Sequence, residues 1–339
     1  MKKILAHNVP DEILLQICSS LTSHELYQLS LSCRALSRVA FEVLSRAIKL
    51  DYAYRDDGSL SHLNGFITKL ERRSGGFLSD IKIAHLSWPI DSELRRRMHH
   101  ILSVLPNIQT LNLKEQFGSL RGFFFGSGDL VGLDENLYNI LLQIPSASTL
   151  RSLTISDTRI TAHDILKLFA MKQLEHLSLN GFNYAMGIEP GEEVPHSQLQ
   201  SLTISSSANP TGRHINIVLA RTPKLRKFTW NFDLSSTLKQ EAIWRALSPA
   251  AMGEALSPLR STLEELYISM APSRFQNDST SLNLSNFLKL RILKVHEEVL
   301  FPSYNELGYV VFCHGLEAQL CERLPPNLEM LEVRRQRDI

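Results

Sequence analysis

A six-residue pattern, Leu-x-x-Leu-x-aliphatic, recurs along most of this 339-residue chain. Its apolar residues alternate with polar ones, which is the period of a strand with one buried face. A strand this short cannot bury that face alone, so the copies must stack on one another. Strict copies are LRSLTI at 150, LEHLSL at 174, LQSLTI at 199, LEELYI at 263, LRILKV at 290 and LEMLEV at 328; looser copies are IAHLSW at 83, IQTLNL at 108 and LRKFTW at 225.

The copies are spaced like structural repeats. Five of the eight start-to-start distances lie between 24 and 27 residues, inside the range of leucine-rich repeats. The other three distances are 42, 38 and 38 residues, and they leave room for insertions near 114–149, 231–262 and 296–327. The segment LRGFFF at 120 imitates the motif but starts too close to the copy at 108, so we interpret it as a loop or an extra hairpin.

The repeats predict an α/β fold, an irregular leucine-rich-repeat solenoid with parallel strands on a concave face and helices outside. We expect irregularity because the asparagine that leucine-rich repeats place after each strand has no equivalent here. Ile48 and Leu50 predict an extra capping strand, followed by a connecting helix. Further helices are expected in the segments that start at residues 91, 134, 162, 215, 237 and 307.

Alternation along each strand assigns its side chains to two faces. In LRSLTI, Leu153 and Ile155 point into the core, so their neighbours point to the concave face. That face is rich in small hydroxyl and amide groups, which suits a peptide or protein more than a small molecule; a merely solvated face is the alternative. The candidate substrate-binding residues are Thr154, Ser156, Ser178, Asn180, Thr203, Ser205, Thr229, Asn231, Tyr267 and Ser269.

Residues 9 to 46 have the period of helices rather than of strands. In VPDEILLQICSSL at 9, Pro10 and the two acidic residues after it suit a first helical turn. Thr22 and Glu25 can form a capping box, which predicts a second helix, and a third follows. Three helices this short cannot bury all their apolar stripes by themselves, so a partner or an attached domain is implied.

This segment resembles an F-box, the module that docks through apolar faces on the Skp-type adaptor of cullin-RING ubiquitin ligases. Val9 departs from the pattern, where leucine is usual, and so does Leu36, where many members carry an aromatic residue. A helical cap without a partner is the alternative. The matching positions include Glu12, Glu25 and Arg34, and the adaptor-binding residues that the resemblance implies are Pro10, Ile13, Leu14, Ile17, Leu21, Leu26, Leu29, Cys33 and Leu36.

Composition and charge argue against several other classes of protein. Lys and Arg number 36 against 35 Asp and Glu, and the net charge of +1 creates no general attraction to nucleic acid or anionic membranes. No apolar run is long enough to span a membrane, and the N-terminus lacks the apolar core of a signal peptide. The four cysteines show no paired metal spacing.

No catalytic motif is present in the sequence. GSGDLVG at 126–132 misses the dinucleotide-binding GxGxxG by one position, and we interpret it as an insertion loop. His99 and His100 follow three arginines on an expected outer helix, which is typical of a solvated basic face. We therefore expect no cofactor, no metal and no enzyme activity.

An F-box followed by leucine-rich repeats resembles the substrate receptors of SCF-type ubiquitin ligases. The chain as a whole is similar to F-box proteins of the fungal type. The resemblance implies an F-box over 1–47, a capping strand and connecting helix over 48–80, and a repeat domain over 81–339. The F-box would bind the Skp-type adaptor and, through it, the cullin and RING subunits. The repeats would bind an unidentified protein substrate, in the cytoplasm, the nucleus or both.

Two other functions remain open. The first is a leucine-rich-repeat scaffold whose F-box no longer engages an adaptor; the second, more distant, is an enzyme with its site in the insertions. In the ligase complex the chain is expected to be a monomer, because charge guards the edge of the strand at 328–333. The guarding residues are Glu329, Glu332, Arg334, Arg335 and Arg337.

Overall fold

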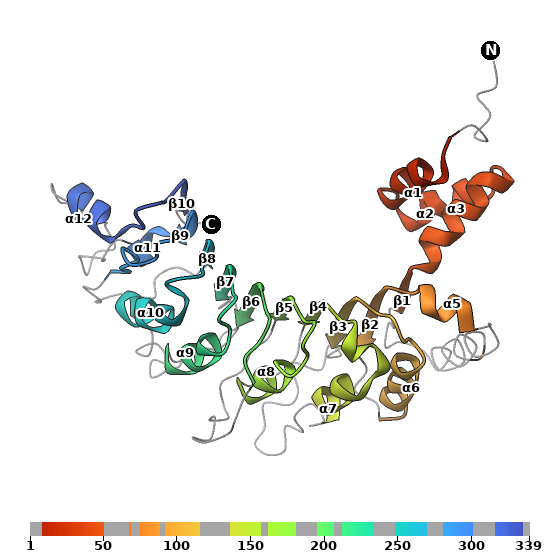
Figure 1. Cartoon of the computed structure of the whole chain (residues 1–339), viewed down its shortest axis with the longest axis horizontal. Helices are drawn as coiled ribbons and strands as arrows, with labels where there is room; N and C mark the ends of the chain where they lie inside the picture. The colour runs from red at the N-terminus through yellow and green to blue at the C-terminus, as the bar shows by residue number, and fades with distance from the viewer. Residues whose placement is uncertain are drawn as a thin grey trace, which may run out of the picture. The chain divides into compact units, whose positions relative to one another are not determined.

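A computed structural model of the chain shows two compact units, residues 1–125 with 144–150 and residues 126–143 with 151–339. Both units combine parallel strands with helices, so the predicted α/β class is confirmed (Figure 1). The predicted boundaries at 47 and 80 stay predictions. The structure describes residues 9–50, 68, 75–88, 92–115, 136–156, 162–180, 195–206, 212–232, 248–269, 281–300 and 316–334.

Three helices open the first unit: α1 (Asp11–Ser19), α2 (Ser23–Ser30) and α3 (Arg34–Ser45). The predicted capping box is confirmed, because the Glu25 N–H donates to Thr22 Oγ1 at 3.3 Å and the Thr22 N–H donates to Glu25 Oε2 at 2.7 Å. Helix α2 therefore begins where local hydrogen bonding favours it. The three helices share a small core that consists of Leu14, Cys18, Leu26, Val39 and Ala40.

A parallel sheet follows in the same unit. The predicted capping strand is confirmed as β1, which pairs Ile48 with Ala84 and Leu50 with Leu86 of the next strand. Thr110 then pairs with Ile83 as the third strand joins in the same direction. The elements are β1 (Ala47–Leu50), α5 (Gly75–Asp80), β2 (Ile83–Trp88), α6 (Ser92–Ser103), β3 (Thr110–Glu115) and the short 3-10 helix η3 (Pro145–Ser148).

The second unit contains seven parallel strands whose order in the sheet is their order in the chain. Together with β2 and β3, they account for all nine copies of the motif, so the prediction that the copies are structural repeats is confirmed. The strands are β4 (Ser152–Ser156), β5 (His176–Asn180), β6 (Ser201–Ser206), β7 (Lys227–Phe232), β8 (Glu265–Ser269), β9 (Ile292–His296) and β10 (Met330–Arg334).

Alternate side chains of each inner strand lie under helices. In β4, Leu153 and Ile155 are fully buried, whereas Ser152, Thr154 and Ser156 are partly exposed. Figure 1 shows the helices of the second unit on one side of its strands. We call the other side of the sheet the open face; it corresponds to the predicted concave face. The covering helices include α8 (Ala162–Leu168), α9 (Gly212–Ala220) and α10 (Pro249–Ala255).

Most of the expected helices are confirmed, and two, α10 and the four-residue α11, were not predicted. The segments that start at 91, 134, 162 and 215 form α6, α7, α8 and α9, and part of the segment at 307 forms α12. The helix expected at 237 and the segment at 120 lie outside the described residues. Of the two helices that were not predicted, α10 begins because the Ser248 hydroxyl accepts the Ala251 N–H at 3.1 Å. The remaining bounds are α7 (Asn136–Gln143), η5 (Ser257–Leu259), α11 (Glu297–Leu300) and α12 (Leu316–Arg323).

A backbone hydrogen bond repeats just before each strand from β5 to β10. The second residue of each motif donates its N–H to the carbonyl of the second residue in the preceding motif. Glu175 donates to Arg151 at 2.9 Å, Gln200 to Glu175 at 2.8 Å, and Arg226 to Gln200 at 2.9 Å. Equivalent positions of successive repeats therefore lie side by side.

The assignment of faces predicts how two adjacent substitutions differ. Leu202→Ala removes a fully buried side chain from β6, so the free energy of unfolding should fall by about 2–5 kcal/mol. Thr203→Ala removes a partly exposed side chain from the open face and should change it by less than about 0.5 kcal/mol. Urea unfolding followed by circular dichroism measures both changes, and equal losses would contradict the assignment.

Candidate protein-interaction surfaces

Four large apolar side chains of the three-helix segment are exposed. Ile13 and Ile17 on α1 expose 46% and 52% of their area, while Tyr27 on α2 exposes 53% and Leu31, directly after it, exposes 66%. The members of each pair are four residues apart and therefore share one side of their helix. Apolar side chains that gather at a surface in this way mark sites of protein contact.

The nine predicted adaptor-binding residues fall into three groups. The structure places some of them in the segment's own core, so packing within the segment already explains why these positions are apolar. Whether they contact an adaptor stays a prediction. Leu14 and Leu26 are buried, Leu21, Leu29, Cys33 and Leu36 are partly exposed, and Pro10, Ile13 and Ile17 are exposed.

Sequence reasoning did not select Tyr27 and Leu31 for this surface. The only sequence signal for them is their own four-residue spacing on α2. That signal does not distinguish a helix side that packs against α3 from a side that faces solvent, because both sides carry apolar residues. Leu26 and Leu29 occupy the packed side, and Tyr27 and Leu31 remain exposed.

The open face of β4 to β7 is a surface of small polar side chains. All the candidate substrate-binding residues lie on this face or on its continuation in β8, so the structure brings them together in rows. In one row, Thr154 pairs in register with Ser178, which pairs with Thr203. In the adjacent row, Asn180 Nδ2 donates to Ser156 Oγ at 2.9 Å, and Asn231 Nδ2 donates to Ser205 Oγ at 3.3 Å.

Larger and charged side chains replace the small polar ones on β8 to β10. Lys294 Nζ lies 2.8 Å from Glu332 Oε2, and Arg334 Nε donates to Glu332 Oε1 at 2.8 Å. The hydrogen bonds from Lys294 and Arg334 hold the pKa of the Glu332 carboxyl below its ordinary value, and the bond from Lys294 has the larger effect. The same arginine donates to Tyr267 Oη at 2.5 Å, with its guanidinium carbon 5.0 Å from the ring centroid.

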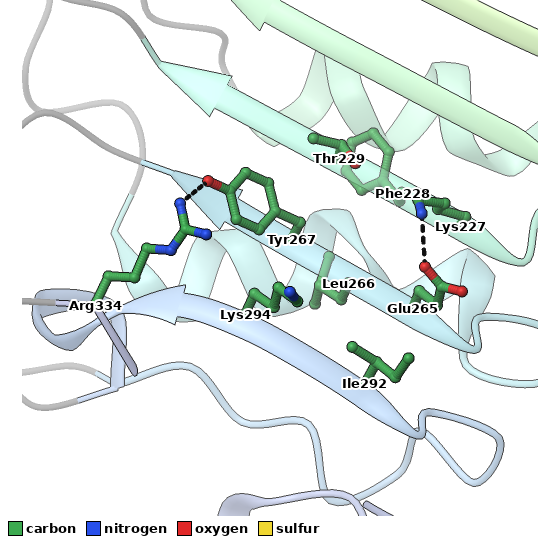
Figure 2. Close-up of a pocket in the computed structure, with 9 residues that line it drawn as sticks. All are labelled: Lys227, Phe228, Thr229, Glu265, Leu266, Tyr267, Ile292, Lys294 and Arg334. Carbon is green, nitrogen blue, oxygen red and sulfur yellow. Dashed lines mark hydrogen bonds and ion pairs between the residues drawn. The ribbon is translucent and has the colours of Figure 1, made fainter. Parts of the chain in front are cut away.

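Tyr267, Lys294 and Arg334 belong to the lining of a hollow of about 240 Å³ on the open face, shown in Figure 2. Its volume falls below the roughly 300–1,000 Å³ of pockets that hold small molecules, so it is suited to one side chain of a protein partner. Lys227 and Glu265, 2.8 Å apart, form one end of the hollow. The lining residues are Lys227, Phe228, Thr229, Glu265, Leu266, Tyr267, Ile292, Lys294 and Arg334.

A separate set of ion pairs joins successive repeats just before their strands. Arg291 and Glu329 form a bidentate pair, with N–O distances of 2.6 and 2.8 Å. Sequence reasoning missed these pairs, although their signal was available: opposite charges occupy the second motif position in successive copies. Exposed pairs of this kind contribute little to stability. The other two are Arg151 with Glu175 at 3.5 Å and Arg226 with Glu264 at 3.7 Å.

The described strand β10 has a neighbour on one side only and is poorly covered. Leu331 and Val333 pair in register with the buried Leu293 and Val295 of β9, yet they expose 39% and 38% of their area. Two of the predicted guarding residues, Glu332 and Arg334, are partnered on the open face of their own sheet. Arg335 and Arg337 lie outside the described residues.

Neither a membrane-spanning helix nor a metal-binding cluster occurs in the part of the chain that the structure describes. None of the helices in the described ranges is long and apolar enough to cross a membrane. Within the same ranges, no three His, Cys, Asp or Glu side chains gather in a way that could hold a metal ion. Cys18 is buried, and burial raises the pKa of its thiol, so it is a poor nucleophile.

Comparison with known proteins supports the F-box interpretation of the N-terminal segment. Residues 6–50 match the F-box-like family model, and F-box segments generally bind Skp-type adaptors. No curated protein sequence was found to match the chain. Among solved structures, a similar chain is the leucine-rich repeat-containing protein LegL7 from Legionella pneumophila, with a TM-score of 0.42, 13% identity, and coverage of 85% of this chain and 90% of that chain.

An F-box-like segment and a series of strand–helix repeats of the leucine-rich type together suggest a role in protein interaction. The strands and helices of the chain itself carry the assignment of the repeat fold. Among the described residues, the exposed apolar pairs on α1 and α2 and the polar open face are surfaces available for such a role.

The exposed strand β10 yields a prediction about self-association. We expect the wild-type chain to be a monomer and the double variant Glu332→Val, Arg334→Val to self-associate, because the variant leaves only apolar side chains on a strand with one free edge. The matched control, Lys227→Val with Glu265→Val, removes an ion pair from strands that have neighbours on both sides. Sedimentation velocity distinguishes the cases; a wild-type dimer or a monomeric β10 variant would contradict the prediction.

Proposed function

We propose that this chain is the substrate-recognition subunit of an SCF-type ubiquitin ligase, of the kind found in fungi. The observation that carries the proposal is the exposed apolar side chains, Ile13 and Ile17 among them, in a segment that matches the F-box-like family. In a soluble complex these side chains would be covered by the Skp-type adaptor. The adaptor would in turn connect the chain to the cullin and RING subunits.

The open face supports the second half of the proposal. Its hydroxyl and amide side chains are not needed for burial, and small side chains let the backbone of a protein substrate come close. Binding adaptor and substrate at once raises the effective concentration of a substrate lysine near the ubiquitin-conjugating enzyme. Under this proposal the chain performs no chemistry itself and acts in the cytoplasm, the nucleus or both.

One observation favours a second candidate function, a repeat scaffold whose F-box does not engage an adaptor. Leu14 and Leu26 are buried in the three-helix core, so part of the F-box pattern is explained by internal packing alone. The two functions differ in a single measurable property, which is co-purification with a Skp-type adaptor.

The test uses a charged substitution at an exposed position. Ile17→Asp should weaken binding to a co-expressed Skp-type adaptor by more than about tenfold, because the interface would have to bury an unpaired carboxylate. The side chain is half exposed in the free chain, so the variant should fold normally, as circular dichroism can verify.

Gln16→Asp is the matched control, because it places the same charge on the adjacent, exposed residue of α1. It should leave adaptor binding within about twofold of wild type. If the wild-type chain does not bind the adaptor in this assay, the scaffold function replaces the ligase function. If both variants bind as well as wild type, the α1 surface is not the docking site.

A further inference from the structure

Charge on the open face of the second unit is concentrated at one end. The open-face residues of β4 to β6 are serine, threonine and asparagine with one histidine, His176. From β7 onward the same rows contain three cations, Lys227, Lys294 and Arg334, and two carboxylates, Glu265 and Glu332. A partner that lies across the whole face would therefore meet uncharged polar groups at one end and a charged cluster with one more cation than carboxylates at the other.

Cations outnumber anions around the hollow in Figure 2. Its lining contains Lys227, Lys294 and Arg334 but only one carboxylate, Glu265, which Lys227 already pairs at 2.8 Å. Lys294 and Arg334 line the hollow from the neighbouring strands β9 and β10. Their ammonium and guanidinium groups converge on a single carboxylate, that of Glu332.

Glu332 demonstrates that the two cations bind a carboxylate with good geometry. It receives one hydrogen bond from each cation at 2.8 Å, and it is itself partly exposed, at 37% of its side-chain area. Pairs at that exposure contribute little to stability, so exchange of this carboxylate for another costs little. Arg334 would keep its place during the exchange, because Tyr267 Oη also holds it.

We propose that the β8–β10 end of the open face binds an acidic segment of a protein partner, one carboxylate of which replaces Glu332 between Lys294 and Arg334. This inference rests on the proposed function and names the chemistry of its substrate. The hollow accommodates the acidic side chain, and the hydroxyl and amide rows of β4 to β7 lie along the path of the rest of the segment. Glu332 acts as an internal competitor that weakens binding of weakly acidic sequences.

The experiment measures fluorescence anisotropy with the full chain and two labelled decapeptides. One probe alternates glutamate and serine, and the other alternates glutamine and serine, so they differ in charge but hardly in size. The wild-type chain should bind the glutamate probe about tenfold more tightly, and either Lys294→Met or Arg334→Met should abolish that preference. Glu332→Gln should tighten binding of the glutamate probe, because it removes the competitor but keeps the side-chain volume.

Arg291→Met is the matched control, because Arg291 is an exposed cation that pairs with Glu329 and does not line the hollow. It should leave the preference for the glutamate probe unchanged. Equal affinity for the two probes, an equal loss in Arg291→Met and Lys294→Met, or weaker binding in Glu332→Gln would each overturn the proposal.

The design separates this inference from the proposed function. The anisotropy assay contains no adaptor, and adaptor binding is measured on the same variants by co-purification. If the glutamate probe fails to bind while adaptor binding persists, only the acidic-segment proposal is wrong. If the probe binds as expected but the adaptor does not, the acidic site stands and the ligase role is wrong.

Discussion

Parallel pairing between neighbouring strands is the constraint on which the rest of the repeat structure depends. A five-residue strand such as β5 exposes its leucines unless the next strand and a helix cover them. The repeated N–H to carbonyl bonds before the strands, 2.7–2.9 Å long, hold each repeat at one register relative to its neighbour. Burial of Leu177, Leu202 and Phe228 under the helices follows from that register.

Register also organises the residues that do not contribute to the core. Because equivalent positions lie side by side, open-face side chains form rows across the strands rather than isolated groups. The row that contains Ser178, Thr203 and Thr229 continues into Tyr267 and Lys294. Substitutions along such a row change what the surface can bind without disturbing the buried leucines, which is how one repeat architecture can serve different partners.

The three-helix segment differs from the repeats in how its apolar side chains are buried. Its described core is small and consists of Leu14, Cys18, Leu26, Val39 and Ala40, and large apolar side chains remain outside. A domain of this size gains little from its own core. Cover from a partner would therefore add to stability, and the same side chains that make the free segment marginal make it suited to docking.

The sequence by itself determined where the strands lie, which side chains are buried in the strands before β10, and where α2 begins, because these depend on local period and local hydrogen bonds. It did not reveal that Leu331 and Val333 of β10 stay exposed. It also did not reveal that Leu26 is buried while Tyr27 and Leu31 are exposed, because that choice depends on which side of α2 packs against α3. Nor did it reveal the contact between Arg334 and Tyr267, which are 67 residues apart in the chain. Only tertiary structure decided such contacts, because insertions of variable length separate the repeats in sequence while backbone pairing places them side by side in space.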